Sequence, residues 1–374
     1  MLFVAPQTAE AGQHMAFSSG ASSNLEEKRQ HLVLVGGGHA HVQVIKALRA
    51  RPNHLKVTLI DQLASASYSG MVQGSIAGAY KTKETLIHLR PLADWAGIQF
   101  IQDKVVDIDL DSKNISLQAE AAPEPFDVIS VDIGSTSSGL DLVPGAREFS
   151  IPTRPIHKLV ESLEHARVEL RNSRDLVHLV VVGAGTAGIE LALATTGRWR
   201  RDGIPYRCTL LDSRDGLLPN ESTDGRAMMK RVLEEANIQV RHISKVESMT
   251  QKKITIKCEG NAEEIEFSTC VWATGAGSHA LPLVLSRKQG LAASKDGFIE
   301  VNSKLQSTTH PFVFAAGDCV NIHAGNKRVP KAGVYAVRAG PVLIENLIRQ
   351  LDCMRNCDSI SGAQLTEYQP QVRL

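Results

Sequence analysis

The sequence has little net charge. Its 41 Lys and Arg residues nearly balance 40 Asp and Glu residues, for a formal net charge of +1 at pH 7. Such a balance gives no field that would attract nucleic acid or an anionic lipid surface. No apolar run reaches the roughly 20 residues that span a bilayer, so any membrane contact would be peripheral. The remaining composition, 43% hydrophobic and 22% charged over 374 residues, indicates a globular chain of two or three domains.

Cysteine and catalytic spacings are also scarce. The six cysteines are scattered, mostly within apolar runs, which favours buried thiols in a reducing, cytoplasmic compartment, with organellar import left open. Only Cys353 and Cys357 share an i,i+4 spacing, which is more often incidental than redox-active. No Ser-His-Asp, paired-carboxylate or zinc-ligand spacing stands out. His39 and His41 would point to different faces of a helix, so we expect no metal site.

A strand, glycine turn and helix pattern occurs twice. One apolar run leads into Gly36-Gly37-Gly38, and another leads into a turn with glycines at 183, 185 and 188. In such turns the first glycine reverses the backbone, the second allows a pyrophosphate to approach, and the third allows close helix–strand packing. The phosphates then lie at the helix N-terminus. Each unit continues into a short strand that ends in an acid, Asp61 or Asp212, which can accept hydrogen bonds from ribose hydroxyls.

Two such units predict sites for two dinucleotides. The expected fold is α/β, with two Rossmann-like, three-layer βαβ domains and the second domain inserted into the first. The predicted divisions are a disordered leader (1–29), a discontinuous first domain (30–152 and 276–352), an inserted domain (153–275) and a C-terminal tail (353–374).

Several further segments carry expectations. Residues 68–78, rich in glycine, follow the second strand at the edge where ligands bind in open α/β sheets, although a plain surface loop is the alternative. Residues 104–117 alternate like a hairpin. Residues 151–155 are rich in proline and indicate a linker. Helices are expected at 156–170, at 227–236 and at 331–351, the last kinked or restarted at Gly340-Pro341. Buried strands are expected to end at Gly134, Gly275 and Gly317-Asp318.

These motifs together resemble the two-dinucleotide-binding flavoproteins of the pyridine nucleotide-disulfide oxidoreductase superfamily. Within it, the runs Gly-Gly-Gly-His-Ala-His-Val, Tyr-Ser-Gly-Met, Val-Asp-Ile-Gly-Ser and residues 330–338 look most similar to type II NADH dehydrogenase-like proteins and to the flavoprotein module fused to selenide, water dikinase. The resemblance covers roughly residues 30–350.

The resemblance implies a role for each motif. The first turn (Gly36, Gly37, Gly38, His39, Ala40) and Asp61 would hold the ADP half of FAD, with Val105 and Gly134 in the same site. Asp318, after Gly317, would contact the ribityl chain, and the helix that starts near Lys331 and Ala332 would aim its N-terminus at the flavin. Gly183, Gly185, Gly188, Asp212 and Gly275 would bind the nicotinamide cofactor. Asp212 favours NADH, whereas Arg214 keeps NADPH as an alternative.

Two side chains are candidates for a direct part in the chemistry. Glu190 would lie near the nicotinamide and tune hydride transfer or relay a proton, although an acid in the first turn of a helix is also favoured by the helix dipole. Lys331 would act electrostatically beside the flavin, or else be a solvated charge at a helix start.

The sequence departs from the family pattern in three ways. His41 stands where the third glycine of the first turn would be, so the helix must move away or accommodate an imidazole. No cysteine pair follows that turn, which disfavours a thiol relay. The paired glutamines that type II NADH dehydrogenases present to quinone, and their amphipathic membrane-binding tail, are not found, which leaves acceptor binding and dimer formation open.

The function expected from the resemblance is an FAD-dependent NAD(P)H dehydrogenase that passes electrons to a small-molecule acceptor, with quinone as one candidate. The alternative from another class is a non-turnover flavoprotein that senses redox state or binds a partner. A disulfide reductase comes third.

Overall fold

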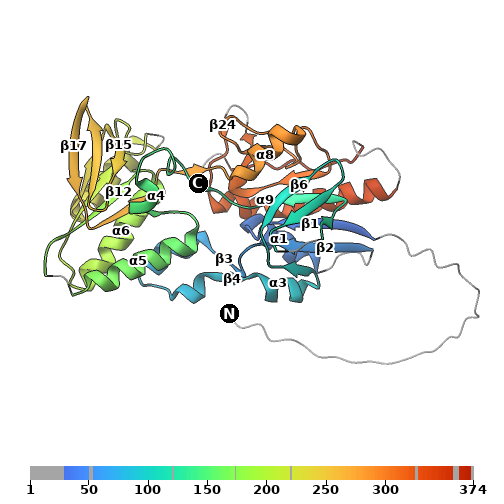
Figure 1. The fold of residues 1–374 in the computed structure, drawn as a ribbon, viewed down its shortest axis with the longest axis horizontal. Coiled ribbons are helices and arrows are strands. Elements are labelled where there is room, and N and C mark those ends of the chain that lie inside the picture. The colour runs from blue at the N-terminus through green and yellow to red at the C-terminus, as the bar shows by residue number, and fades with distance from the viewer. Residues whose placement is uncertain are drawn as a thin grey trace, which may run out of the picture.

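Two parallel five-stranded sheets form the framework, one in each of two lobes (Figure 1). The computed structural model describes residues 29–49, 54–119, 122–172, 174–219, 221–324, 327–356 and 362–371. The predicted leader, apart from residue 29, lies outside these ranges, as does Cys357. In the part of the chain that is described, no helix is both long and apolar enough to cross a membrane.

The first sheet draws its strands from both ends of the chain. In order across the sheet they are β21 (Val313–Ala315), β9 (Val128–Val131), β1 (Gln30–Val35), β2 (Leu55–Ile60) and β5 (Gln99–Ile101). Helices α1 (His39–Leu48), α3 (Leu89–Ala96) and α9 (Gly333–Arg355) pack beside it. An antiparallel sheet contributes Ile108 and Ile115 to the same core, and its strands are β6 (Val105–Asp109), β7 (Asn114–Leu117) and β8 (Glu124–Pro125). The hairpin expected at 104–117 is therefore confirmed.

The second sheet repeats this plan. Its order is β11 (Ile151–Pro152), β18 (Thr269–Trp272), β12 (Val177–Val182), β13 (Tyr206–Leu211) and β14 (Ile238–Arg241). Alternate side chains of β12 face opposite ways, so Leu179 and Val181 pack with the helices while Val180 and Val182 pack with a second antiparallel sheet. Those helices are α5 (Ile156–Leu170), α6 (Thr186–Arg201) and α7 (Thr223–Glu235), and the antiparallel strands are β15 (Ser244–Met249), β16 (Lys253–Cys258) and β17 (Asn261–Glu266).

The second lobe is inserted into the first. The chain leaves through β10 (Thr136–Ser137) and α4 (Ala146–Phe149) and returns through β19 (Ala276–Gly277), which pairs antiparallel with β10. The segment predicted as a proline-rich linker begins as β11, which pairs with β18 on the sheet edge, where a proline costs no internal ladder bond. That part of the linker prediction is wrong. The exact domain boundaries stay predictions.

The remaining elements are short, except α8. They are β3 (Ser65–Ser67), η1 (Ser69–Met71), α2 (Val72–Ile76), η2 (Thr82–Thr85), β4 (Leu86–His88), α8 (Ala280–Gln289), β20 (Ile299–Glu300), η3 (Gly317–Cys319), β22 (Val320–Asn321), β23 (His323–Ala324) and β24 (Lys327–Arg328). Helix α2 comes from the first lobe but packs against α5 and α6, and its Val72 is buried in the core of the second lobe. The segment 68–78 therefore contains a helical bridge between the lobes and not only a loop.

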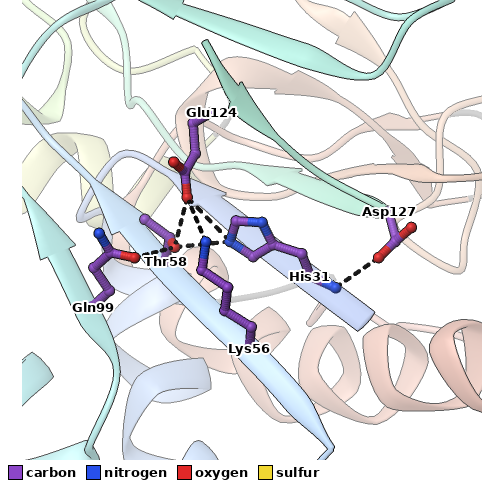
Figure 2. Close-up of polar contacts among 6 residues, drawn as sticks. All are labelled: His31, Lys56, Thr58, Gln99, Glu124 and Asp127. Atoms are coloured by element: carbon purple, nitrogen blue, oxygen red, sulfur yellow. Dashed lines mark hydrogen bonds and ion pairs between the residues drawn. The ribbon is translucent and has the colours of Figure 1, made fainter. Parts of the chain in front are cut away.

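A buried histidine–threonine pair lies at the amino-terminal edge of each sheet. Nε2 of His31 lies 2.8 Å from Oγ1 of Thr58, and Nε2 of His178 lies 2.8 Å from Oγ1 of Thr209 (Figure 2 shows the first pair). Burial lowers the pKa of both imidazoles, which favours their neutral forms. Because this edge is opposite the glycine turns, the pairs are structural, and they show that the internal repeat extends beyond the turns.

Helix α9 is continuous through Pro341, so it does not restart there, and a kink at this point stays a prediction. It crosses α1 closely at Gly340, where an added methyl group would overlap Cβ of Gln43 and lie 3.0 Å from the carbonyl oxygen of Ala40. The glycine therefore sets the distance between two helices that flank the first sheet.

We predict that Gly340→Ala destabilises the protein by about 1–3 kcal/mol, because the methyl group must push α1 and α9 apart. The matched control is Gly197→Ala in α6, where a methyl group would meet no atom within 4 Å. That change should stabilise by about 0.5–1 kcal/mol through helix propensity. Urea unfolding followed by circular dichroism measures both, and equal effects of the two variants would contradict the packing argument.

Candidate functional site

Both glycine turns lie at the points where the strand order of their sheets reverses. After β1 the chain runs outward through β2 and β5 and returns to β9 on the other side of β1. After β12 it runs through β13 and β14 and returns to β18 on the other side of β12. In open α/β sheets the crevice at such a reversal, beyond the carboxyl ends of the strands, is where ligands bind. The two turns therefore mark two equivalent binding edges.

The first glycine of each turn is required by a close backbone approach. Gly36 and Gly183 have φ of +92° and +106°, a conformation that favours glycine. A methyl group at Gly36 would overlap the carbonyl oxygen of Asp132, and one at Gly183 would overlap that of Ala273. These carbonyls follow β9 and β18, so each turn is pressed against the end of the neighbouring strand.

Other predicted glycines border open space. A methyl group at Gly185, Gly134 or Gly275 would meet no atom within 4 Å. At Gly188, by contrast, it would overlap the carbonyl oxygen of Gly183, so this third glycine serves the packing of α6. The side of each site that would receive a ligand is thus free of protein side chains at these positions.

The first turn accommodates an imidazole in place of its third glycine. His41 is fully buried, with Nδ1 2.6 Å from the carbonyl oxygen of Gly36 and Nε2 2.8 Å from Oγ of Ser130. Burial lowers its pKa to about 4. The neutral ring can donate from Nδ1 and accept from the hydroxyl at Nε2, so it links turn and strand by hydrogen bonds where Gly188 uses direct contact.

The two acids that follow the second strands differ in their surroundings. Asp61 accepts main-chain hydrogen bonds from Gly37 at 2.6 Å and from Leu63 at 2.7 Å, and burial raises its pKa. Asp212 is 2% exposed and forms a two-point pair with Arg214, whose Nε and Nη2 each lie 3.0 Å from a carboxylate oxygen. The second acid is thus covered by a cation.

Asp318 lies at the joint between the lobes. Its Oδ2 accepts hydrogen bonds from Nη2 of Arg154 and from Oγ of Ser135, both at 3.1 Å. Arg154 follows β11 of the second sheet, whereas Ser135 follows β9 of the first. The carboxylate of Asp318 therefore connects the segment that runs between the lobes with the binding edge of the first sheet. Gly317, with φ of +76°, turns the chain in front of it.

Helix α9 begins at Gly333 with Ala332 at its N-cap. The ammonium group of Lys331 donates to the carbonyl oxygen of Val320 and lies 4.1 Å from the ring centre of Phe298. Burial lowers its pKa to about 8. Lys331 is therefore a half-buried, fixed charge and not a solvated one, beside a small pocket that Asp318 and Tyr335 also line.

Glu190 contacts the bridge between the lobes. Its Oε2 accepts a hydrogen bond of 2.7 Å from Nε2 of Gln73 in α2. It lies in α6, close to the second glycine turn. The bridging segment also reaches the first site, because His39 stacks on Tyr68 with ring centres 5.4 Å apart and accepts a 3.2 Å hydrogen bond from the N–H of Ser69.

The predicted residues fall into two groups. Gly36, Gly37, Gly38, His39, Ala40, Asp61, Gly134, Gly317, Asp318 and Ala332 come together around the first turn, with Lys331 beside them. Gly183, Gly185, Gly188, Asp212 and Gly275 come together around the second turn, with Glu190 on the helix that follows. Val105 begins β6, and its part in a cofactor site stays a prediction.

Two residues of the first site were missed from the sequence. Asp132, 2% exposed, accepts hydrogen bonds from the N–H groups of Ala40 and His41 in the first turn of α1. Arg154 pairs with Asp318. Asp132 carries a sequence signal, because a charged residue directly after a buried apolar strand needs partners. Arg154 carries none, because its contact depends on the path between the lobes.

The thiols do not favour a thiol relay. Among the described cysteines, Cys208, Cys258, Cys270 and Cys319 are free. Burial raises the pKa of the Cys208 and Cys319 thiols to about 12 and that of Cys270 further still. Such thiols are poor nucleophiles at neutral pH.

Two Rossmann-type domains, each with a glycine turn and an acid at its switch point, define an α/β protein of the nucleotide-binding Rossmann class. The chain belongs to the pyridine nucleotide-disulphide oxidoreductase family, whose pattern matches residues 30–340.

Among its relatives, an Arabidopsis thaliana alternative NAD(P)H-ubiquinone oxidoreductase C1 (chloroplastic/mitochondrial) is 24% identical over 81% of this chain, which spans 64% of that protein. A type II NADH:quinone oxidoreductase of Staphylococcus aureus is 21% identical, over 88% of this chain and 84% of the relative. The structure of the sulfide:quinone oxidoreductase from Aquifex aeolicus has the same fold, with a TM-score of 0.74 and 20% identity, over 86% of this chain and 77% of that one.

The buried imidazole at the first turn predicts a loss of stability in acid. Because the pKa of His41 falls from an unfolded value of about 6.5 to about 4 in the folded protein, its contribution is complete above pH 6.5. As the pH falls from 6.5 to 4 this contribution is lost, which lowers the free energy of unfolding by about 3 kcal/mol. His41→Gln removes this titration, so the stability advantage of the wild type over the variant should shrink across that interval. Urea unfolding at pH 4.5, 5.5 and 7 measures it, and a constant difference would contradict a neutral, buried His41.

Proposed function

We propose that this chain is an FAD-dependent NAD(P)H dehydrogenase that passes electrons to a small-molecule acceptor, with a quinone as the first candidate. The observation that carries the proposal is the pair of glycine turns at two switch points, each followed by a buried or half-buried acid. Relatives named as NAD(P)H-ubiquinone and NADH:quinone oxidoreductases support both the reaction and the acceptor.

The residues of the first turn fit the adenosine and pyrophosphate part of FAD. Among the described residues no cation pairs with Asp61, which can accept from a ribose hydroxyl while it holds Gly37. Asp318 would turn from Arg154 and Ser135 toward a ribityl hydroxyl. The N-terminus of α9 would face the part of the flavin that gathers negative charge on reduction. When bound, the flavin would supply hydride acceptance and electron transfer, chemistry that side chains cannot provide.

The second turn fits NAD(P)H. The open space at Gly185 and Gly275 leaves room for the pyrophosphate and nicotinamide halves. Glu190 would orient the nicotinamide end, and its hydrogen bond to Gln73 would hold it toward the lobe that carries the flavin. Lys331 would act as a fixed positive charge near the flavin. These side chains would bind and orient the cofactors and exclude water, and none is required as a nucleophile.

The purified protein tests the proposal directly. We expect a yellow protein whose flavin absorbance bleaches on anaerobic addition of NADH or NADPH and returns when a soluble quinone is added. Gly185→Ala should keep the wild-type stability but raise the KM for NAD(P)H at least tenfold, because its methyl group meets no protein atom but enters the cofactor space. Gly197→Ala is the control and should leave KM unchanged. A colourless protein, or flavin that NAD(P)H does not bleach, would refute the proposal. Bleaching without turnover would favour the redox-sensing alternative.

The Asp212–Arg214 pair makes a prediction about cofactor choice. A guanidinium that covers the acid can receive a 2′-phosphate, whereas the free acid favours a 2′-hydroxyl. Arg214→Ala should therefore raise the KM for NADPH about tenfold or more and leave the KM for NADH within about twofold. Arg207→Ala, an exposed arginine on the preceding strand, serves as the control. Equal changes for the two cofactors in Arg214→Ala would show that Arg214 does not contribute to the choice.

A further inference from the structure

The two turns differ in what lies beneath the helix N-terminus. Asp132 and Ala273 occupy equivalent positions, because Asp132 follows β9 beside β1 and Ala273 follows β18 beside β12. The N–H of Asp132 donates to the carbonyl oxygen of Val35 at 2.8 Å, and the N–H of Ala273 donates to that of Val182 at 2.7 Å. At α6 the alanine offers no acceptor. At α1 the carboxylate of Asp132 accepts from the N–H of Ala40 at 2.8 Å and from that of His41 at 3.2 Å.

The carboxylate has no room to move away. It fills the space between the first glycine turn and Gly317, since a methyl group at Gly38 or at Gly317 would overlap its oxygens. With 2% exposure it has almost no access to water. A negative charge at this place therefore stays within the N-terminal turn of α1, where the partial positive charge of the helix would otherwise be available to a phosphate.

The titratable groups near Asp132 lie on the elements packed around it. Asp61 after β2 and Asp318 in η3 act on it with their negative charges, and the adjoining thiol of Cys319 is neutral at physiological pH. On α1, His41 is held neutral by burial, and burial also lowers the pKa of His39. Burial, assisted by Asp318 and Asp61 but opposed by the two main-chain N–H groups, raises the pKa of Asp132 to about 7.

We propose that Asp132 is a positioning residue that must be a neutral acid when the dinucleotide is bound at the first turn, so that binding of FAD takes up one proton. The phosphates and an ionised Asp132 would compete for the same helix terminus, and protonation ends that competition. The acidic hydrogen also gives Asp132 a donor, while the second oxygen still accepts from Ala40 and His41. The second site, with Ala273, has no such coupling. The inference rests on the proposed binding of FAD at the first turn.

Binding of FAD to protein stripped of flavin tests the coupling. For the wild type, the Kd measured by flavin fluorescence should rise about tenfold for each pH unit above pH 7, as expected for one linked proton. In Asp132→Asn, which keeps an acceptor for α1 without the charge, the Kd should change less than about threefold between pH 6.5 and pH 9. The matched control is Asp127→Asn at the opposite end of β9, where the carboxylate accepts a hydrogen bond from the N–H of His31. It should keep the wild-type slope.

Calorimetry of the wild type decides the case even if the variant does not fold. Titration of FAD at pH 8 in two buffers of different ionisation enthalpy should show the uptake of close to one proton for each flavin bound. No uptake, or a slope that persists in Asp132→Asn, would overturn the inference and leave the proposed function intact. A persistent slope would point instead to Lys331, whose pKa of about 8 lies in the same range. Failure of the wild type and of Asp127→Asn to bind FAD would overturn the proposed function and this inference together.

Discussion

The contact on which the structure depends is the one between each glycine turn and the end of the strand beside it. At Gly36 and Gly183 the backbone touches the carbonyl groups of Asp132 and Ala273 so closely that a Cβ atom has no place. This contact fixes where the first strand of each sheet ends and where α1 and α6 begin. It therefore directs the N-termini of α1 and α6 at the two crevices, and the binding proposed for both lobes depends on it.

The two lobes reach this geometry with different chemistry. The second uses small residues, with Gly188 against the carbonyl oxygen of Gly183 and Ala273 at the strand end. The first uses polar ones, with the imidazole of His41 bonded to Gly36 and the acid of Asp132 bonded to α1. The second therefore packs its turn by contact alone, whereas the first turn rests on a buried acid and a buried base. Asp132 and His41 therefore have no titratable counterparts at the equivalent positions of the second turn, Ala273 and Gly188.

The sequence was sufficient for the parts that depend on local pattern. The apolar strands, the glycine turns and the helix at 156–170 follow from residue order and periodicity, and the duplicated turns led to the correct fold class and family. Pattern was not sufficient where the contact partner is remote in sequence. Residues 151–152 pair with β18 more than 100 positions away, and Val72 enters the core of the other lobe. Arg154 meets Asp318 only because the chain crosses between the lobes.

The central claim is that each lobe holds one dinucleotide at its own glycine turn. Native mass spectrometry of the purified protein counts bound molecules directly. The account predicts a retained mass increment of one FAD for each chain, and a second increment of one nicotinamide dinucleotide when an excess of NAD⁺ is added, with the flavin still in place. A single increment in which NAD⁺ displaces the flavin would mean that the two turns do not form two sites, and would contradict the account.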